Sequence, residues 1–238
     1  MTTFALLGSG EFLPWSEEVD RAVLARANGD GSVLIVPTAS AKEGGEVFDG
    51  WARKGLDHFG SLGIRAEVVP IRTREDASRG EIVRMLDRAS VAYFSGGNPA
   101  YLAATLSETP FWRSLRAAMD QGVAYIGCSA GVACLGSLAP DSDAREFDGE
   151  VWKPGLGVFP HAWFGPHWDA LDTFVPGLTD FIVSSVPQGD TLVAIDENTA
   201  MVGDGASWSV TGASGAHVLR DGEWAHHTAG SAFELPLV

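Results

Sequence analysis

The chain has 238 residues, 31 acidic side chains against 16 basic ones, and a formal net charge of −15. This length suits one large domain over residues 1–238 with a substantial core. The acidic balance argues against binding to nucleic acid, which requires clustered Lys and Arg. No apolar run approaches the roughly 18 residues of a membrane span, so a membrane is not expected as a partner either.

Short apolar runs alternate with helical patterns through the first half of the chain. Strands are expected at 4–7, 32–37, 65–70 and 91–94, and an apolar run from Val123 leads to Ser129; helices are expected at 16–28, 46–62, 79–88, 99–106 and 110–120. This alternation predicts an α/β fold, a three-layer sandwich with a mostly parallel central sheet and helices on both faces.

The pattern changes after about residue 140. Residues 140–150 are polar and acidic, which is typical of a surface loop. Short strand-like segments follow at 192–195, 200–202, 207–210 and 216–219, separated by Gly and Asp. We expect these segments of the C-terminal third to form an antiparallel extension at one edge of the sheet.

Ser129 lies in the sequence Gly127-Cys-Ser-Ala-Gly131, between an apolar run and a helical pattern. This is the arrangement of a nucleophile elbow, in which a strained turn lifts the serine hydroxyl out of the sheet. Side chains at Gly127 and Gly131 would collide with the adjoining strand and helix. The helix that follows directs amide groups toward developing negative charge. We therefore interpret Ser129 as a catalytic nucleophile.

A serine needs a base to accept its proton, and that base is usually a histidine held by a carboxylate. We prefer His167 because the preceding Gly165-Pro166 resembles the end of a strand, and His161 remains an alternative. The acid should follow a strand, and the segment 192–195 runs directly into Asp196 and Glu197. Successive residues of an extended chain point to opposite sides, so only one of these two carboxylates can face the histidine.

Amide groups for an oxyanion hole should come from Ala130, directly after the nucleophile, and from the turn formed by Gly96, Gly97 and Asn98. That turn follows the strand at 91–94. Ligands of open parallel sheets collect beyond the carboxyl ends of the strands, so the turn and the elbow should meet at one edge of the sheet.

The cysteines Cys128 and Cys134 lie six residues apart around the elbow. This is neither a disulfide framework nor the spacing of a metal site, so we expect no metal ion and no other cofactor. Reduced thiols suit a cytoplasmic protein. The apolar N-terminal stretch is too short for a signal peptide and lacks its basic start, which fits the same location.

Four segments together resemble the S51 serine peptidases. They are Phe94-Ser-Gly-Gly-Asn98, Gly127-Cys-Ser-Ala-Gly131, Gly155-Leu-Gly-Val158 with a histidine after it, and Ile195-Asp-Glu-Asn-Thr-Ala200. The family includes aspartyl dipeptidase and cyanophycinase, and the resemblance implies the fold of class I glutamine amidotransferases. It also implies a Ser-His-Glu triad, with Ser129 as nucleophile, His167 as base and Glu197 as the orienting acid.

The resemblance further implies Gly97 and Ala130 as oxyanion donors, a small peptide or related amide as the substrate, and a homodimer as one assembly found in the family. The sequence departs from cyanophycinases, which carry Asp-Gln before the histidine and several arginines after it. Here Gly165 and Pro166 precede His167, and no arginine lies between Arg145 and Arg220. Cleavage of the acidic cyanophycin polymer is therefore not expected.

Two other functions are compatible with the sequence. An esterase of the α/β-hydrolase type would use Ser129, Asp196 and either His226 or His227, in the chain order serine, acid, histidine. A binding protein that keeps the fold without catalysis is the other alternative. The favoured prediction is a serine hydrolase that acts on small peptides or amides through an acyl-enzyme.

Overall fold

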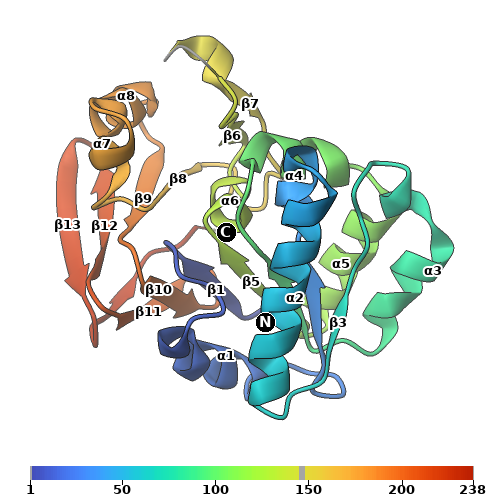
Figure 1. The fold of residues 1–238 in the computed structure, drawn as a ribbon. Coiled ribbons are helices and arrows are strands. Elements are labelled where there is room, and N and C mark those ends of the chain that lie inside the picture. The colour runs from blue at the N-terminus through green and yellow to red at the C-terminus, as the bar shows by residue number, and fades with distance from the viewer. Residues whose placement is uncertain (1, 145–147, 238) are drawn as a thin grey trace.

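The computed structural model describes residues 2–144 and 148–237. Within these residues, eight strands form one large sheet, with the order β14-β11-β10-β1-β5-β4-β2-β3 (Figure 1). Neighbours among β1, β5, β4, β2 and β3 run parallel, and β10, β11 and β14 add antiparallel strands beside β1. The bounds are β14 (Ala232–Glu234), β11 (Ser207–Gly212), β10 (Thr199–Gly203), β1 (Phe4–Leu7), β5 (Ala124–Cys128), β4 (Val91–Phe94), β2 (Val33–Val36) and β3 (Ala66–Val68).

Helices cover both faces of this sheet because its parallel strands are apolar on both sides. On one face, Val19 and Val23 of α1 and Phe59 of α2 pack against side chains such as Ile35 and Ile126. The opposite face packs against the other helices, and there the core includes Leu102. The helices are α1 (Glu17–Leu24), α2 (Gly45–Ser61), α3 (Gly80–Val83), α4 (Pro99–Leu106), α5 (Pro110–Asp120) and α6 (Ala130–Ala133). The predicted α/β sandwich is confirmed.

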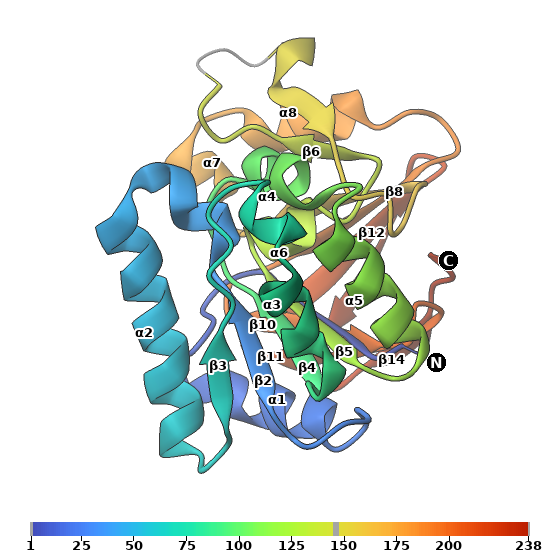
Figure 2. The same ribbon diagram turned by 90° about the vertical axis from the view of Figure 1, so that its right-hand side faces the viewer.

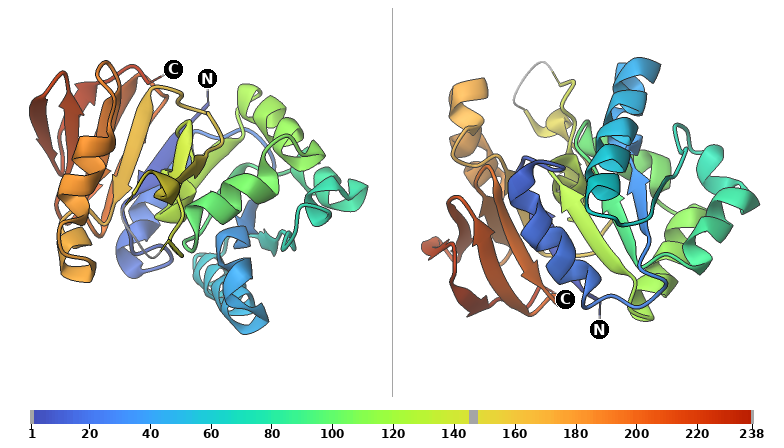
Figure 3. Two further views of the ribbon diagram at one scale, coloured as in Figure 1. Left: turned by 90° about the horizontal axis from the view of Figure 1, so that it is seen from above. Right: turned by 60° about the horizontal axis from the view of Figure 1, so that its bottom comes forward.

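Four further strands of the described chain form a second sheet with the order β13-β12-β9-β8. Their bounds are β8 (Ala162–Pro166), β9 (Thr191–Ile195), β12 (Gly215–Arg220) and β13 (Glu223–Thr228). Figure 3 shows the orange-to-red strands of the C-terminal third gathered on the side of the molecule away from α2 and α5. The prediction that 192–195 and 216–219 extend the large sheet is therefore wrong, although β10 and β11 do extend it.

Three smaller elements lie at one end of the molecule. The hairpin of β6 (Leu138–Pro140) and β7 (Trp152–Pro154) and the helices α7 (Leu171–Phe174) and α8 (Leu178–Ser185) gather there (Figures 1 and 2). The polar loop predicted at 140–150 lies partly outside the described range, at residues 145–147. In residues 2–144 and 148–237, no helix combines the length and apolar character needed to cross a membrane.

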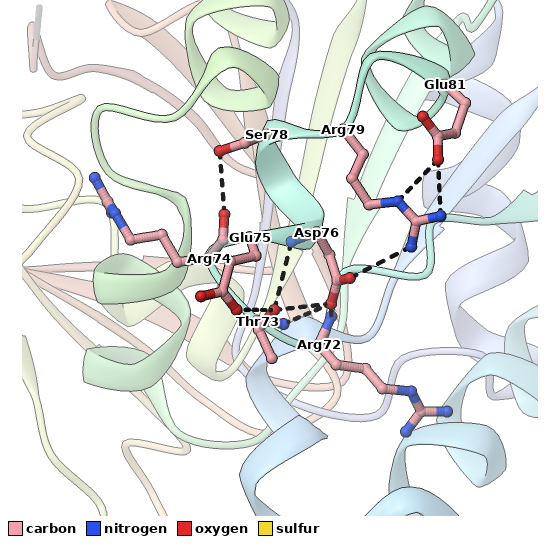
Figure 4. A network of polar contacts seen from close by, with 8 residues as sticks. All are labelled: Arg72, Thr73, Arg74, Glu75, Asp76, Ser78, Arg79 and Glu81. Atoms are coloured by element: carbon pink, nitrogen blue, oxygen red, sulfur yellow. Dashed lines mark hydrogen bonds and ion pairs between the residues drawn. The ribbon is translucent and has the colours of Figure 1, made fainter.

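The connection from β3 to α3 is held by the carboxylate of Asp76 (Figure 4). It accepts hydrogen bonds from the backbone amides of Arg72 at 3.0 Å and Thr73 at 2.9 Å, and Arg79 lies 3.6 Å away. The Arg72 guanidinium pairs with Asp49 on α2. These contacts fix the edge of the sheet beyond β3 and tie it to α2.

Candidate active site

Ser129 occupies the sharp turn between β5 and α6. Its backbone has φ of 52° and ψ of −107°, a conformation that non-glycine residues rarely adopt and that stores strain. A methyl group at Gly127 would lie 2.3 Å from the Gly131 carbonyl oxygen, and one at Gly131 would lie 2.5 Å from the Phe94 carbonyl oxygen. The predicted need for glycine at both positions is confirmed, because only glycine permits this close packing of the turn.

His167 follows the last residue of β8, and its φ of 57° turns the chain sharply there. The Trp168 amide donates to the Ile195 carbonyl at 3.1 Å, which joins this turn to the end of β9. The two parallel strands β8 and β9 thus deliver residues 167 and 197 to the same edge. His167 Nε2 lies 2.9 Å from Ser129 Oγ.

Glu197 lies on the other side of the His167 ring, with Oε1 3.0 Å from Nδ1. Its own amide donates to Asp169 Oδ1 at 2.8 Å, which fixes the backbone at the end of β9. An ionised Glu197 accepts a hydrogen bond from His167 Nδ1–H, so the ring proton is on Nδ1. The lone pair of Nε2 is then directed at the Ser129 hydroxyl. The alcohol, imidazole and carboxylate therefore form one continuous hydrogen-bonded line.

The alternatives that the sequence left open have other partners. His161 is an exposed side chain bonded to Asp190 at 3.1 Å, and it has no bond to Ser129. Asp196 is buried and faces the other side of its strand, where it accepts from Ser214 Oγ at 2.6 Å and lies 3.0 Å from His217 Nε2. The alternation expected for adjacent residues of an extended chain is observed.

The esterase arrangement is not assembled. His226 Nδ1 lies 2.7 Å from His217 Nδ1, and the ring of His227 stacks on Phe233 at a centroid distance of 3.6 Å. Neither ring is bonded to Ser129, whose imidazole partner is His167.

The turn after β4 lies beside Ser129. Gly97 has φ of 140°, and a methyl group there would lie 2.3 Å from the Ala39 carbonyl carbon. No group in the described part of the chain accepts a hydrogen bond from the Gly97 amide. Ala130 opens α6, where first-turn amides have no acceptor within the helix. Both residues line the cavity that contains Ser129, so their amides are available to an oxyanion there.

Asn98 has a different position from the one expected. Its amide donates to the Ala39 carbonyl at 2.9 Å, its Oδ1 caps α4 by accepting from the Tyr101 amide at 3.0 Å, and its Nδ2 donates to Asp141 at 2.7 Å. The Asn98 amide therefore already has an acceptor and is not free for an oxyanion, contrary to the prediction from the sequence. Asn98 holds the turn in place instead.

Comparison with known proteins places this chain in a family. The model of peptidase family S51 matches residues 4–211. The chain belongs to peptidase family S51. A crystal structure of a peptidase from an acI-B1 Actinobacterium superposes on this S51 protein with a TM-score of 0.90 and 29% identity, covering 99% of this chain and 97% of the other.

Two further proteins are similar to this chain, one in sequence and one in fold. A protein named cyanophycinase from Synechococcus elongatus is 33% identical over 182 residues, which are 73% of this chain and 54% of the relative. The chain thus spans about half the length of that relative. A putative peptidase E protein from Listeria monocytogenes EGD-e shares the fold, with a TM-score of 0.64 and 21% identity over 90% of this chain and 100% of the other.

One residue at this site was not predicted from the sequence. Glu11 follows β1 and is buried, with 7% of its surface exposed. Its Oε1 accepts from the Gly96 amide at 2.8 Å, and its Oε2 accepts from the Cys128 thiol at 2.9 Å. Glu11 therefore joins the turn that carries Gly97 to the strand that carries Ser129. Its place directly after a glycine-rich strand end was the available signal.

Burial and the neighbouring Glu11 carboxylate raise the pKa of the Cys128 thiol well above its usual value. Cys128 is fully buried and points away from the cavity around Ser129. A neutral, enclosed thiol is a poor nucleophile. Within residues 2–144 and 148–237, no cluster of three or more His, Cys, Asp or Glu side chains is arranged to hold a metal ion.

Proposed function

We propose that this S51 protein is a serine hydrolase that cleaves small peptides or related amides through an acyl-enzyme. The observation that carries the proposal is the line of short contacts, 2.9 Å from Ser129 Oγ to His167 Nε2 and 3.0 Å from His167 Nδ1 to Glu197 Oε1. Family membership and the similarity to proteins named peptidase and cyanophycinase support hydrolysis as the reaction class.

In the first step, Ser129 Oγ attacks the carbonyl carbon of the substrate while its proton passes to His167 Nε2. Glu197 accepts the Nδ1 proton in a hydrogen bond and stabilises the resulting imidazolium. The negative charge that forms on the carbonyl oxygen is stabilised by the amides of Gly97 and Ala130. The tetrahedral intermediate then collapses. The carbon–nitrogen bond breaks, and the leaving amine takes the proton from His167.

Hydrolysis of the acyl-enzyme repeats these roles with water. His167 accepts a proton from the water that attacks the ester carbon, and it returns this proton to Ser129 Oγ when the carboxylic acid leaves. The side chains of His167 and Glu197 are 28% and 36% exposed, so water reaches the site from the His167 side. No metal ion or other cofactor is needed for these steps.

A fluorophosphonate tests the nucleophile, because it forms a bond from phosphorus to an activated serine oxygen and releases fluoride. We expect intact-mass analysis to find one adduct on the wild-type protein and none on Ser129→Ala. Peptidase activity of Ser129→Ala should fall on the order of 10⁶-fold, as in other serine peptidases. The matched control Ser137→Ala removes an exposed hydroxyl that is bonded to the Pro160 carbonyl, and it should label fully. Equal labelling of Ser129→Ala would refute the assignment.

A further inference from the structure

A cavity of about 300 Å³ opens directly on Ser129. This is at the lower end of the roughly 300–1,000 Å³ found for small-ligand sites. One side contains the reacting groups, Ser129 and His167, together with Gly97 and Ala130. Its other lining residues are mainly apolar, and many of them belong to β8, α7, α8 and the chain between those two helices. They include Phe164, Leu171, Val175, Leu178, Phe181 and Ile182.

The aromatic residues near His167 are divided between this cavity and the core. Phe164 is buried and lines the cavity. Trp163 is also buried, but it packs edge-on against Trp152 and belongs to the small core under α8. Trp168 lies tilted against Trp224, with ring centroids 5.7 Å apart, and is not among the residues that line the cavity. The apolar lining therefore comes from Phe164, from α7, α8 and the residues that connect them, and from Val151 and Trp152 at the start of β7.

Charge in the cavity disfavours an acidic ligand. Among its described lining residues there is no Lys or Arg, and the one carboxylate is Asp141. The hydrogen bond from the Asn98 side chain holds the pKa of Asp141 below its usual value, so this carboxylate is ionised at neutral pH. The lysines of adjoining segments are paired with other acids, Lys42 with Asp143 and Lys153 with Glu150.

The place of the cavity identifies which part of a substrate enters it. A carbonyl carbon within reach of Ser129 Oγ has its oxygen directed to the amides of Gly97 and Ala130, which line the same cavity. The side chain of the same residue is attached to its Cα atom, which is bonded directly to the carbonyl carbon. A second hollow on the other side of His167 contains the charged residues Lys54 and Asp57. It therefore offers a less apolar surface to the leaving amine.

We propose that this cavity is the specificity site for the acyl residue of the substrate and selects a bulky apolar side chain such as that of Leu, Met or Phe. The proposal rests on the proposed serine hydrolase function. Binding in an apolar cavity becomes more favourable with each carbon atom of the side chain that is buried there. Burial of a carboxylate without a cationic partner is unfavourable. Among the described lining residues, the side chains that favour an apolar substrate residue therefore disfavour an acidic one.

A set of N-acetyl aminoalkyl diphenyl phosphonates tests this selectivity. Each reagent forms a bond from phosphorus to the serine oxygen and releases phenol, so only the side chain differs between them. We expect the Leu and Phe reagents to inactivate the wild-type protein at least about tenfold faster than the Ala reagent, since one methylene in an apolar pocket changes rates by about 10–200-fold. The Asp reagent should be the slowest of the four.

Two arginine variants separate the cavity from its surroundings. Val175→Arg places a cation in the cavity lining, and Thr173→Arg adds the same charge two residues away, at an exposed position outside the lining. We expect Val175→Arg to slow the Leu reagent at least about tenfold and to accelerate the Asp reagent. Thr173→Arg should keep the wild-type order of the four reagents.

A small ethyl fluorophosphonate, which has no amino-acid side chain, is used in parallel with every variant. If it labels Ser129 while the Asp reagent is fastest, or while the Ala and Leu reagents react equally, the specificity proposal is wrong and the hydrolase proposal stands. If Val175→Arg loses this labelling, Leu178→Ala replaces it and should slow the Leu reagent selectively. Failure of the wild-type protein to react with any of these reagents would overturn both proposals.

Discussion

Glu11 shows how one buried side chain links two parts of the site. Its two carboxylate oxygens hold the Gly96 amide on one loop and the Cys128 thiol on the neighbouring strand. Gly96 precedes Gly97, and Cys128 precedes Ser129, so the bridge joins the residues before the proposed oxyanion donor and before the proposed nucleophile. We infer that Glu11 is a positioning residue that sets the distance between these two groups.

Replacement of Glu11 should affect the rate of the chemical step more than substrate binding. Glu11→Ala frees the Gly96–Gly97 turn, and a displacement of about 1 Å can cost about 10²-fold in kcat. Glu11→Gln keeps an oxygen for the Gly96 amide and should recover most of the activity. The measurement is kcat and KM for both variants. A loss confined to KM, or a Gln variant as inactive as Ala, would contradict the positioning role.

The position of Glu11 after a glycine-rich turn was a weak signal, because an acid at such a turn usually lies in solvent. Only the fold shows that this carboxylate is enclosed against β5. The same limit applies to Asn98, whose type suits both a helix cap and an oxyanion donor. Ser129, Ala130 and Gly97 were easier to predict, because they follow β5 and β4, neighbouring parallel strands of the large sheet. His167 was indicated by the Gly-Pro pair that ends β8 in the second sheet.

The end of β9 carries two adjacent carboxylates with different surroundings. Glu197 meets the His167 ring, and Asp196 accepts hydrogen bonds from Ser214 and the Gly215 amide on the opposite side. The alternation of an extended strand accounts for this division. One carboxylate is expected to serve the reaction and the other the stability of the second sheet.

Alanine substitutions should separate these two roles. Glu197→Ala should lower kcat on the order of 10⁴-fold, the cost of removing the acid from a comparable triad, with little change in the free energy of unfolding. Asp196→Ala leaves the Gly215 amide without its carboxylate acceptor in a buried position and should lower the free energy of unfolding by about 1–3 kcal/mol. Urea unfolding and steady-state kinetics measure both. If Glu197→Ala lowered mainly the free energy of unfolding and Asp196→Ala mainly kcat, the two roles would be reversed.

The helices and strands up to β5 followed from the sequence, but β8 and the grouping of the late strands did not. Strands 192–195 and 216–219 have the same apolar pattern as 200–202, and that pattern does not state which neighbour a strand pairs with. The pairing is decided by β8, a strand that starts at Ala162 and runs parallel to β9. Its Gly and Pro content concealed it, since both residues are uncommon inside strands.

At the scale of the whole molecule, the reactivity of the two free thiols shows whether the helices on each face of the large sheet stay packed against it. Cys128 packs in the core that includes α1 and α2, and Cys134 packs in the core on the opposite face. Burial raises the pKa of Cys134 to about 12 and that of Cys128 well above its usual value. Both thiols are therefore neutral in the folded protein at neutral pH.

Neither thiol should react with Ellman's reagent in the native protein at pH 8, and both should react after unfolding in guanidinium chloride, because the thiolate is the reactive form. The raised pKa values also predict the pH dependence of stability. Their contribution is complete below the unfolded-state pKa near 9 and decreases as the pH rises above it. Rapid reaction of one thiol in the native protein would show that the helices covering it separate from the sheet without global unfolding.

The central claim is that Ser129 forms an acyl-enzyme with the help of His167 and Glu197. Rapid mixing with a p-nitrophenyl ester of N-acetyl leucine, followed by acid quenching and peptide mass analysis, tests it most directly. We expect a nitrophenol burst approaching one equivalent per active site, with the acyl group on the peptide that contains Ser129 and no burst from Ser129→Ala. An equal burst from Ser129→Ala, or an acyl group on another residue, would contradict it.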